Sequence, residues 1–182
     1  PSDLSQQVFE GDADSDNGAS ASEEAPERRL PVTHQVEMRA HHKTVTCLAL
    51  DAKGCRLVTG GSDHKLCFWD FAGMTRELRP FRELEQPLGA VQIRSIDFSP
   101  RAAKLIVAGA NPQPMILDRD GRKLTSLMRG DMYIHDMRHT KGHVGAATCA
   151  KWNPVDLQSV CTAAADGTVR LWDGEVAVGR GD

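Results

Sequence analysis

The chain has 182 residues, of which 40% are hydrophobic and 26% charged, so it is long enough to build a packed core. Its net charge of −3 disfavours direct binding of nucleic acid, because that function needs a concentration of basic residues. No apolar run approaches the roughly 18 residues of a membrane-spanning helix, and the odd number of cysteines, without C-x-x-C spacing, disfavours a disulfide framework.

The first segment, residues 1–30, is rich in Asp, Glu, Ser, Ala and Gly, with Phe9 as its only aromatic residue. A segment of this composition cannot bury enough apolar surface to offset the entropy lost when a chain becomes ordered. We therefore predict that residues 1–30 form a disordered acidic tail.

Short runs of alternating β type begin after Pro31 and are separated by Gly, Asp, Asn and Pro. No long helical period accompanies them. The pattern predicts an all-β protein with many short strands, and such proteins are often built from repeats. The runs are HQVEMR (34–39), TVTCLAL (44–50), RLVTGG (56–61), KLCFWD (65–70), RSIDFS (94–99), KLIVAG (104–109), PMILD (114–118), TCAKWN (148–153) and TVRLWD (168–173).

Two of these runs end in Trp-Asp and share the same upstream residues. In both, an Asp precedes the Trp by six residues, a Thr precedes that Asp by four, and a His precedes it by 22 or 23. Such constant offsets indicate an internal repeat. The matched residues are His41, Thr59, Asp63 and Trp69 in the first unit, and His143, Thr162, Asp166 and Trp172 in the last.

A third unit is expected between these two, because the tryptophans are 103 residues apart and one repeat of this kind takes about 40–45 residues. Aligning GGSDHKLCFWD (60–70) with AGANPQPMILD (108–118) shows that the middle unit has lost the polar set. The four corresponding positions hold Gly89, Val107, Asn111 and Leu117.

The middle unit also carries two turn signals. Pro112 and Pro114 cannot donate to a central ladder, so ANPQPMILD (110–118) predicts a turn and an outer strand whose edge faces solvent. The Asp-Gly pair in LDRDGRKL (117–124) predicts a hairpin between the outer two strands of a repeat.

With these frames in place, the chain resembles the WD40-repeat family. KGHVGAATCAKWNPVDLQSVCTAAADGTVRLWD (141–173) fits the family pattern almost throughout, and RAHHKTVTCLALDAKGCRLVTGGSDHKLCFWD (39–70) fits it with Ala40 where Gly is usual. Three further stretches resemble the subfamily of WD repeat-containing protein seventy, the gastrulation-defective homologue: RLVTGGSDHKLCFWDFAGM, LDRDG and GDMYIHDMRHTKGH. The resemblance covers about residues 31–173 and implies an incomplete β-propeller of about three blades.

The resemblance also implies that the His, Thr, Asp and Trp of one unit form a buried hydrogen-bonded network. A hydrolase triad of His, Asp and Thr is the rival interpretation of the same residues. It is disfavoured because a triad need not recur with a Trp at fixed spacing, whereas a repeat fold must. No catalytic residue and no cofactor is assigned.

A cluster of histidines lies ahead of the last unit, with His135, His139 and His143 at i, i+4 and i+8. On a helix, this spacing would bring three imidazoles to one face, as in a zinc site. Gly142 and the β-rich surroundings favour a connector between blades instead, so no metal is assigned. A metal-dependent hydrolase at this cluster remains the alternative function, and an RNA-binding module is a second one.

The expected organisation is a tail over residues 1–30, blades over about 31–88, 89–130 and 131–173, and a non-repeat tail over 174–182. PVTHQVEMR (31–39) is expected to be an outer strand of a further blade, so the chain is interpreted as a fragment. Its two uncovered blade faces indicate missing blades or self-association.

The family resemblance implies a non-catalytic scaffold that binds other proteins in nuclear complexes of genome maintenance or RNA processing. It implies a location in the nucleus, with the cytoplasm as an additional site. The composition, as argued above, predicts association with neither membrane nor nucleic acid.

Overall fold

The computed structural model describes residues 35–134 and 139–174. The chain divides into two units, Pro1–Val36 and Glu37–Asp182, and all of the strands belong to the second. The predicted acidic tail, residues 175–182 and His135 lie outside the described residues. Within the two described ranges, no helix has the length and apolar character that crossing a bilayer requires.

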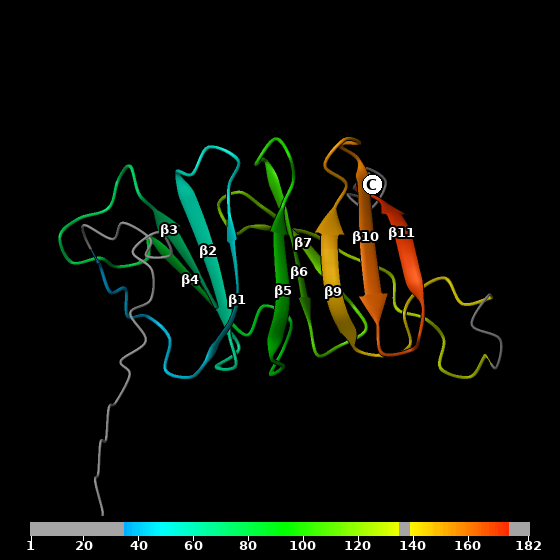
Figure 1. Ribbon diagram of the computed structural model, residues 1–182. Helices are drawn as coiled ribbons and strands as arrows, with labels where there is room; N and C mark the ends of the chain where they lie inside the picture. Colours follow the sequence, from blue (N-terminus) through cyan, green and yellow to red (C-terminus); the bar gives the residue numbers. More distant parts are fainter. Residues whose placement is uncertain (1–34, 135–138, 175–182) are drawn as a thin grey trace, which may run out of the picture. The chain divides into compact units, whose positions relative to one another are not determined.

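Eleven strands, in the part of the chain that is described, form three antiparallel sheets (Figure 1). The prediction of an all-β protein with about three blades is therefore confirmed. The first sheet contains β1 (Val45–Leu50), β2 (Arg56–Gly61), β3 (Lys65–Asp70) and β4 (Arg82–Glu85), in that order. The second contains β5 (Ile93–Phe98), β6 (Lys104–Gly109), β7 (Met115–Asp118) and β8 (Lys123–Ser126), and the third contains β9 (Ala147–Trp152), β10 (Ser159–Ala164) and β11 (Val169–Asp173).

One cross-strand pair recurs at the same register in each sheet. It joins the second strand of the sheet to the third and places an aliphatic residue opposite the large residue that precedes Asp. The pairs are Leu57 with Trp69, Leu105 with Leu117, and Val160 with Trp172. Because a slip of one residue would turn every side chain to the other face, this shared register shows that the middle sheet is a third copy of the unit.

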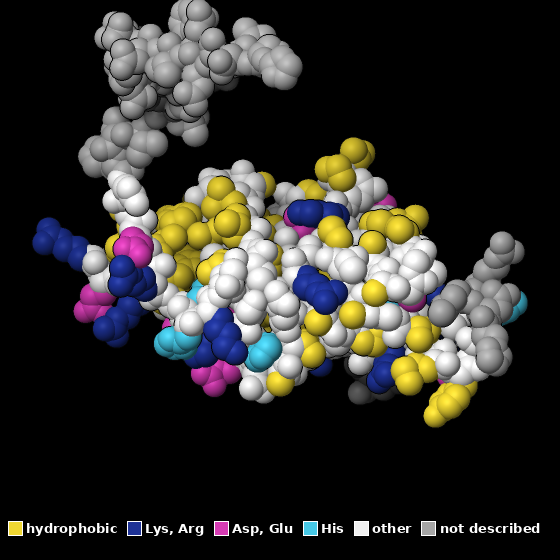
Figure 2. Space-filling model, turned by 60° about the horizontal axis from the view of Figure 1, so that its bottom comes forward, with side chains coloured by type: hydrophobic (Ala, Val, Ile, Leu, Met, Phe, Trp, Pro, Cys, Tyr) yellow, Lys and Arg dark blue, Asp and Glu magenta, His cyan; other side chains and the backbone are white. Residues whose placement is uncertain are grey.

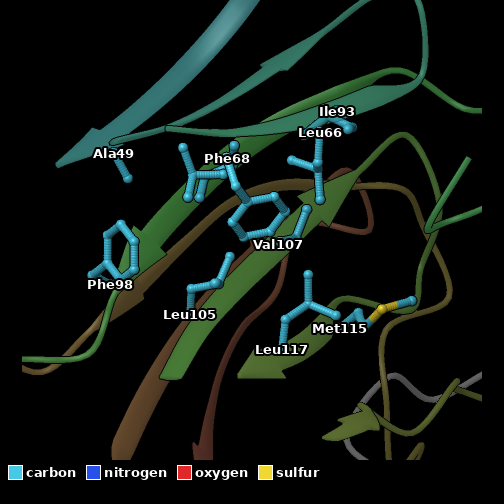
Figure 3. Close-up of a cluster of buried hydrophobic side chains, with 11 residues drawn as sticks. Ala49, Leu66, Phe68, Ile93, Phe98, Leu105, Val107, Met115 and Leu117 are labelled. Atoms are coloured by element: carbon cyan, nitrogen blue, oxygen red, sulfur yellow. The ribbon is translucent and has the colours of Figure 1, made fainter. Parts of the chain in front are cut away.

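The first and second sheets pack face to face around one hydrophobic cluster (Figure 3). Phe68 points from β3 of the first sheet toward Leu105 and Val107 of β6 in the second, and all three side chains are buried. Burial of this apolar surface is the main favourable contribution to the packing of the two sheets.

A second cluster lies between the second and third sheets, where Ile106 and Ile116 face Trp152 and Val160. Successive residues of a strand point to opposite faces, so Leu105 and Ile106 enter different clusters. This position between two sheets explains why β6 reads as the continuous apolar run LIVAG rather than as an alternating one.

Hydrogen bonds also join the first strands of the three sheets, β1, β5 and β9, which lie side by side in Figure 1. The Thr46 hydroxyl donates to the carbonyl oxygen of Ile93 at 2.5 Å. The Ser95 hydroxyl donates to the carbonyl of Ala150 at 3.2 Å and accepts from the amide of the same residue at 3.2 Å. These bonds fix the sheets to one another where the backbones approach most closely.

Near their outer strands, the first two sheets are joined through the β7–β8 hairpin. Arg56 of β2 lies over the ring of Phe81 at 5.1 Å and donates to Asp120 of the hairpin at 2.5 Å. The predicted Asp-Gly hairpin is confirmed, with Gly121 at a φ of 79°. A Cβ added at Gly121 would lie 2.9 Å from Cζ of Phe68, so this turn packs directly on the first sheet.

We expect Gly121→Ala to destabilise the chain by about 1–3 kcal/mol more than Gly54→Ala, because only the first substitution also overpacks a core. Gly54 has a φ of 71° and nothing within 4 Å of its Cβ position, so it carries the same backbone penalty alone. Urea denaturation of the two variants measures the difference. Equal losses of unfolding free energy would show that the hairpin is not packed against Phe68.

Two sequence predictions about strands are wrong. The run 34–39 forms no strand over its described residues 35–39, and no described strand lies beside it to supply the backbone hydrogen bonds that an extended segment needs. β7 is not an outer strand, because it pairs with β6 on one side and β8 on the other. Pro112 and Pro114 precede β7 rather than interrupt it, so its ladder keeps its donors.

The outer faces of the first and third sheets carry exposed apolar side chains. Leu48 of β1 is 65% exposed and Leu171 of β11 is 78% exposed, and each points away from the second sheet. Figure 2 shows hydrophobic side chains gathered at the end of the unit that the first sheet forms. These surfaces agree with the expectation that each outer face is open for a further blade or a partner.

Candidate functional site

The first sheet brings together His41, Thr59, Asp63 and Trp69, the four residues that the repeat singled out. His41 Nδ1 lies 3.0 Å from Oδ2 of Asp63, and His41 Nε2 lies 2.9 Å from the Thr59 hydroxyl. The indole N–H of Trp69 donates to the same hydroxyl at 3.1 Å. The set links β2 and β3 to the segment that precedes β1.

The direction of each bond in this set follows from the chemistry of the groups. The carboxylate of Asp63 only accepts, so His41 Nδ1 carries a proton and donates to it; in the neutral ring Nε2 is then an acceptor. The Thr59 hydroxyl then donates to Nε2 and accepts from Trp69. Every polar atom in this chain of bonds therefore has a partner, which is the condition for burying them without a desolvation penalty.

The third sheet repeats the arrangement with His143, Thr162, Asp166 and Trp172. His143 Nδ1 lies 3.1 Å from Oδ2 of Asp166, His143 Nε2 lies 2.7 Å from the Thr162 hydroxyl, and Trp172 donates to that hydroxyl at 2.7 Å. The side chains of His143 and Asp166 are 0% and 2% exposed. His143, Thr162 and Asp166 are therefore shielded from solvent, and Trp172 is half-buried beside them.

Asp166 also accepts bonds that sequence reasoning did not anticipate. The Thr168 hydroxyl and amide donate to Oδ1 at 2.7 and 3.0 Å, and the Val144 amide donates to Oδ2 at 3.0 Å. Burial alone would raise the pKa of this carboxyl, but the bonds from Thr168, Val144 and His143 together hold its pKa well below the usual range. The sequence signal for Thr168 was its place two residues after Asp166, at the end of a tight turn.

Asp63 has the same kind of environment. Burial would raise its pKa, but hydrogen bonds from His41 and from the amides of His42 and Lys65 lower it. A Cβ added at Gly61 would lie 2.5 Å from Oδ1 of Asp63, so glycine is needed there for the carboxylate to approach the backbone.

The middle sheet replaces the polar set with apolar side chains. Val107 and Leu117 are buried at the positions that Thr and Trp occupy in the other sheets, as the alignment predicts. Asn111, at the position of Asp, donates to the carbonyl of Leu88 at 3.0 Å. Val107 and Leu117 replace both partners of the Thr–Trp hydrogen bond by apolar groups, which is close to neutral in free energy. Among the described residues, the Oδ1 atom of Asn111 is buried without a hydrogen-bond partner.

The lowered pKa values of Asp63 and Asp166 predict a loss of stability in acid. A group whose pKa is lower in the folded state stabilises the fold above its unfolded pKa, which is about 4 for Asp, and loses this contribution as the pH falls through the folded pKa. We therefore expect the melting temperature to fall progressively below about pH 4. Melting curves of the double variant Asp63→Asn/Asp166→Asn should show a weaker dependence over the same range, and an unchanged dependence would contradict this assignment.

The geometry bears on both alternative sites. The His, Asp and Thr of the rival triad in the third sheet are buried and hydrogen-bonded to one another or to neighbouring groups, so the Thr162 hydroxyl does not face solvent. Both ring nitrogens of His143 lie within hydrogen-bond distance of Asp166 and Thr162. His135 lies outside the described residues, so the three-histidine cluster stays a hypothesis; within the described ranges no group of three His, Cys, Asp or Glu could hold a metal ion.

The connector that precedes the last sheet is anchored at both of its described ends. Gly130 donates its amide to the carbonyl of His143 at 2.9 Å, and Arg170 of β11 donates to the carbonyl oxygen of Thr140 at 2.7 Å. Gly142 lies so close to Met128 that a Cβ there would meet its carbonyl oxygen at 2.0 Å. The connector thus positions His143 for its bonds to Asp166 and Thr162.

A family model described as "WD domain, G-beta repeat" matches residues 33–70 and 135–173. These are the two units that contain the polar sets, and the shared register adds the middle sheet as a third. The chain is a WD40-repeat protein. Its sheets are blades, and the hydrogen-bonded His, Thr, Asp and Trp of each outer blade lie within the two matched ranges.

Relatives of this WD40 chain include proteins of an insect, an amphibian and a mammal. It is 43% identical over 152 residues to the gastrulation defective protein 1 homolog of Drosophila melanogaster and 42% identical over 148 residues to WD repeat-containing protein 70 of Xenopus tropicalis. It is 39% identical over 150 residues to WD repeat-containing protein 70 of Homo sapiens. These matches cover 84%, 81% and 82% of this chain but only 23%, 24% and 23% of the relatives' own lengths, respectively.

Proposed function

We propose that the chain is a non-catalytic scaffold that binds other proteins, as part of a multi-protein complex in the nucleus. The observation that carries this proposal is the burial of its most reactive-looking residues. His143, Thr162 and Asp166 bond to one another within the blade, so the residue types that could form a triad are engaged in holding strands together.

The surface supports a role in binding proteins. Met128, Met132 and Tyr133 of the last connector are exposed, and Tyr133 is 89% exposed. Met and Tyr are enriched in protein interfaces, where large side chains fill pockets of a partner. The sequence similarity to WD repeat-containing protein 70 also supports a role in binding proteins, because WD40 blades generally present such surfaces to proteins.

The nuclear location and a role in genome maintenance or RNA processing belong to the same proposal and rest on the subfamily resemblance alone. A metal-dependent hydrolase or an RNA-binding module would instead need a site at the surface. No observation on the described residues favours either of them.

The proposal is tested by purifying the endogenous protein through an epitope tag, separately from nuclear and cytoplasmic extracts, after cross-linking in cells. We expect stoichiometric protein partners in the nuclear fraction, with cross-links to the exposed faces and connectors of the blades. Recovery of the protein without stoichiometric partners, together with a hydrolytic activity that is lost in His135→Ala, would overturn it.

A further inference from the structure

A groove of about 440 Å³ lies between the outer edges of the first and second blades. β4 and the residues up to Pro87 form one wall, and the β7–β8 hairpin forms the other. Both walls belong to complete four-stranded sheets. The groove therefore does not depend on the uncovered face of either end blade.

The base of the groove is apolar. Met115 and Leu117 of β7 line it and are 5% and 1% exposed, and the half-buried Leu84 of β4 lines it from the opposite wall. An apolar base with a small number of polar groups around it is typical of a ligand site, because the base supplies affinity and the polar groups supply orientation.

Three cations surround this base. Arg82 projects from β4, Lys123 begins the second strand of the hairpin, and Arg122 immediately precedes that strand. Among the described residues, none of these three side chains forms an ion pair within 4.0 Å. Arg122 lies close enough to Asp120 to help lower the pKa of that carboxyl, but Asp120 pairs directly with Arg56.

The one carboxylate of the lining, Glu85, is already paired. Lys65 Nζ lies 2.9 Å from Glu85 Oε1, and this contact lowers the pKa of Glu85. The groove thus presents an excess of positive charge, in a chain whose net charge is −3.

The hairpin wall is held in place by the contacts that join the two blades. Asp120 accepts from Arg56, and Gly121 packs on Phe68 with Arg82 beside it, whose Cδ would lie 3.3 Å from a Cβ at Gly121. A groove fixed in this way need not be ordered by its ligand, which lowers the entropy lost on binding.

We propose that this groove binds an acidic peptide segment of a partner protein, with an apolar side chain on the base and carboxylates toward Arg82, Arg122 and Lys123. The inference rests on the proposed scaffold function and names the chemistry of one partner segment. A peptide fits better than a nucleic acid, because no aromatic side chain lines the groove to stack a base.

The test uses fluorescence anisotropy with the whole chain and a labelled synthetic peptide that has two leucines flanked by glutamates. Two matched peptides replace the glutamates by lysine or the leucines by serine, and a labelled single-stranded oligouridine is the nucleic-acid probe. We expect saturable binding of the first peptide, weakened by rising salt as charge pairing requires. Each matched peptide should bind at least about tenfold more weakly.

The double variant Arg122→Glu/Lys123→Glu should weaken binding of the first peptide by at least about tenfold. Lys53→Glu/Arg76→Glu removes the same charge from exposed residues outside the groove and should leave binding unchanged. Circular dichroism melting of both variants checks that each remains folded. A second groove variant, Leu84→Ser, tests the apolar base without changing the charge.

Equal binding by the two charge variants, or binding of oligouridine in preference to the peptide, would overturn the groove assignment. If the peptide fails to bind while the tagged protein still recovers stoichiometric partners, the groove proposal is wrong and the scaffold proposal stands. If neither the peptide nor any cellular partner is bound, both are wrong.

Discussion

Replacing Asp166 by alanine is expected to lower the free energy of unfolding by about 2–4 kcal/mol, the range typical of breaking a buried polar network. The substitution removes the acceptor for His143 and for the hydroxyl and amide of Thr168. The Thr168 amide would lose its acceptor, and His143 Nδ1 and the Thr168 hydroxyl would keep only their 3.2 Å contact with each other. Each buried donor that loses its acceptor carries a desolvation penalty. Urea denaturation followed by tryptophan fluorescence measures the loss.

Asp131→Ala is the matched control for this substitution. Asp131 is an exposed carboxylate whose side chain accepts from the amide of Tyr133 at 2.9 Å, so its removal should cost less than about 1 kcal/mol. Asp166→Asn keeps an acceptor oxygen, so its loss of unfolding free energy should lie between those of Asp166→Ala and Asp131→Ala. A similar midpoint for Asp166→Ala and Asp131→Ala would contradict a stabilising role for the network.

Replacing Phe68 by alanine is expected to lower the free energy of unfolding by about 3–5 kcal/mol, as for other large-to-small changes at aromatic core positions. Phe68 is 1% exposed and joins the cluster between the first two blades, so its removal leaves a cavity in a packed core. The loss is measured by the same urea denaturation.

Phe71→Ala removes the same side chain at a position that is 43% exposed and outside the cluster, so we expect it to cost less than about 1 kcal/mol. A cost for Phe68→Ala no larger than that for Phe71→Ala would show that the two blades do not depend on this cluster for their packing.

Repetition made the polar sets predictable from the sequence. Trp69 and Trp172 recur with His, Thr and Asp at fixed offsets, and fixed offsets within one supersecondary unit become fixed positions in space. The middle blade was predictable only through this comparison, since Val107 and Leu117 have no distinctive chemistry of their own.

Features set by contacts between blades were not predictable. β4 has the sequence RELE, in which Leu84 is the only apolar residue, so its four residues carry no apolar alternation that predicts a strand. Its strand geometry comes from its pairing with β3. The groove beside it combines Leu84 with Arg122, which are far apart in the sequence. The incorrect strand at 34–39 has the same origin, because β propensity forms a strand only where a partner edge is present.

The most direct test of the account is a double-mutant cycle between Thr162→Val and Trp172→Phe, which removes the two ends of a 2.7 Å hydrogen bond. The cycle cancels the cost of the smaller ring at position 172, because that cost is present with and without Thr162. If these residues act as one network within a WD40 blade, the cycle should give a coupling energy of about 0.5–3 kcal/mol. Thr59 and Trp172 lie in different blades, so the effects of Thr59→Val and Trp172→Phe on the free energy of unfolding should be additive within about 0.5 kcal/mol. Additive effects for Thr162 and Trp172 would contradict the network and, with it, the structural role assigned to the polar sets.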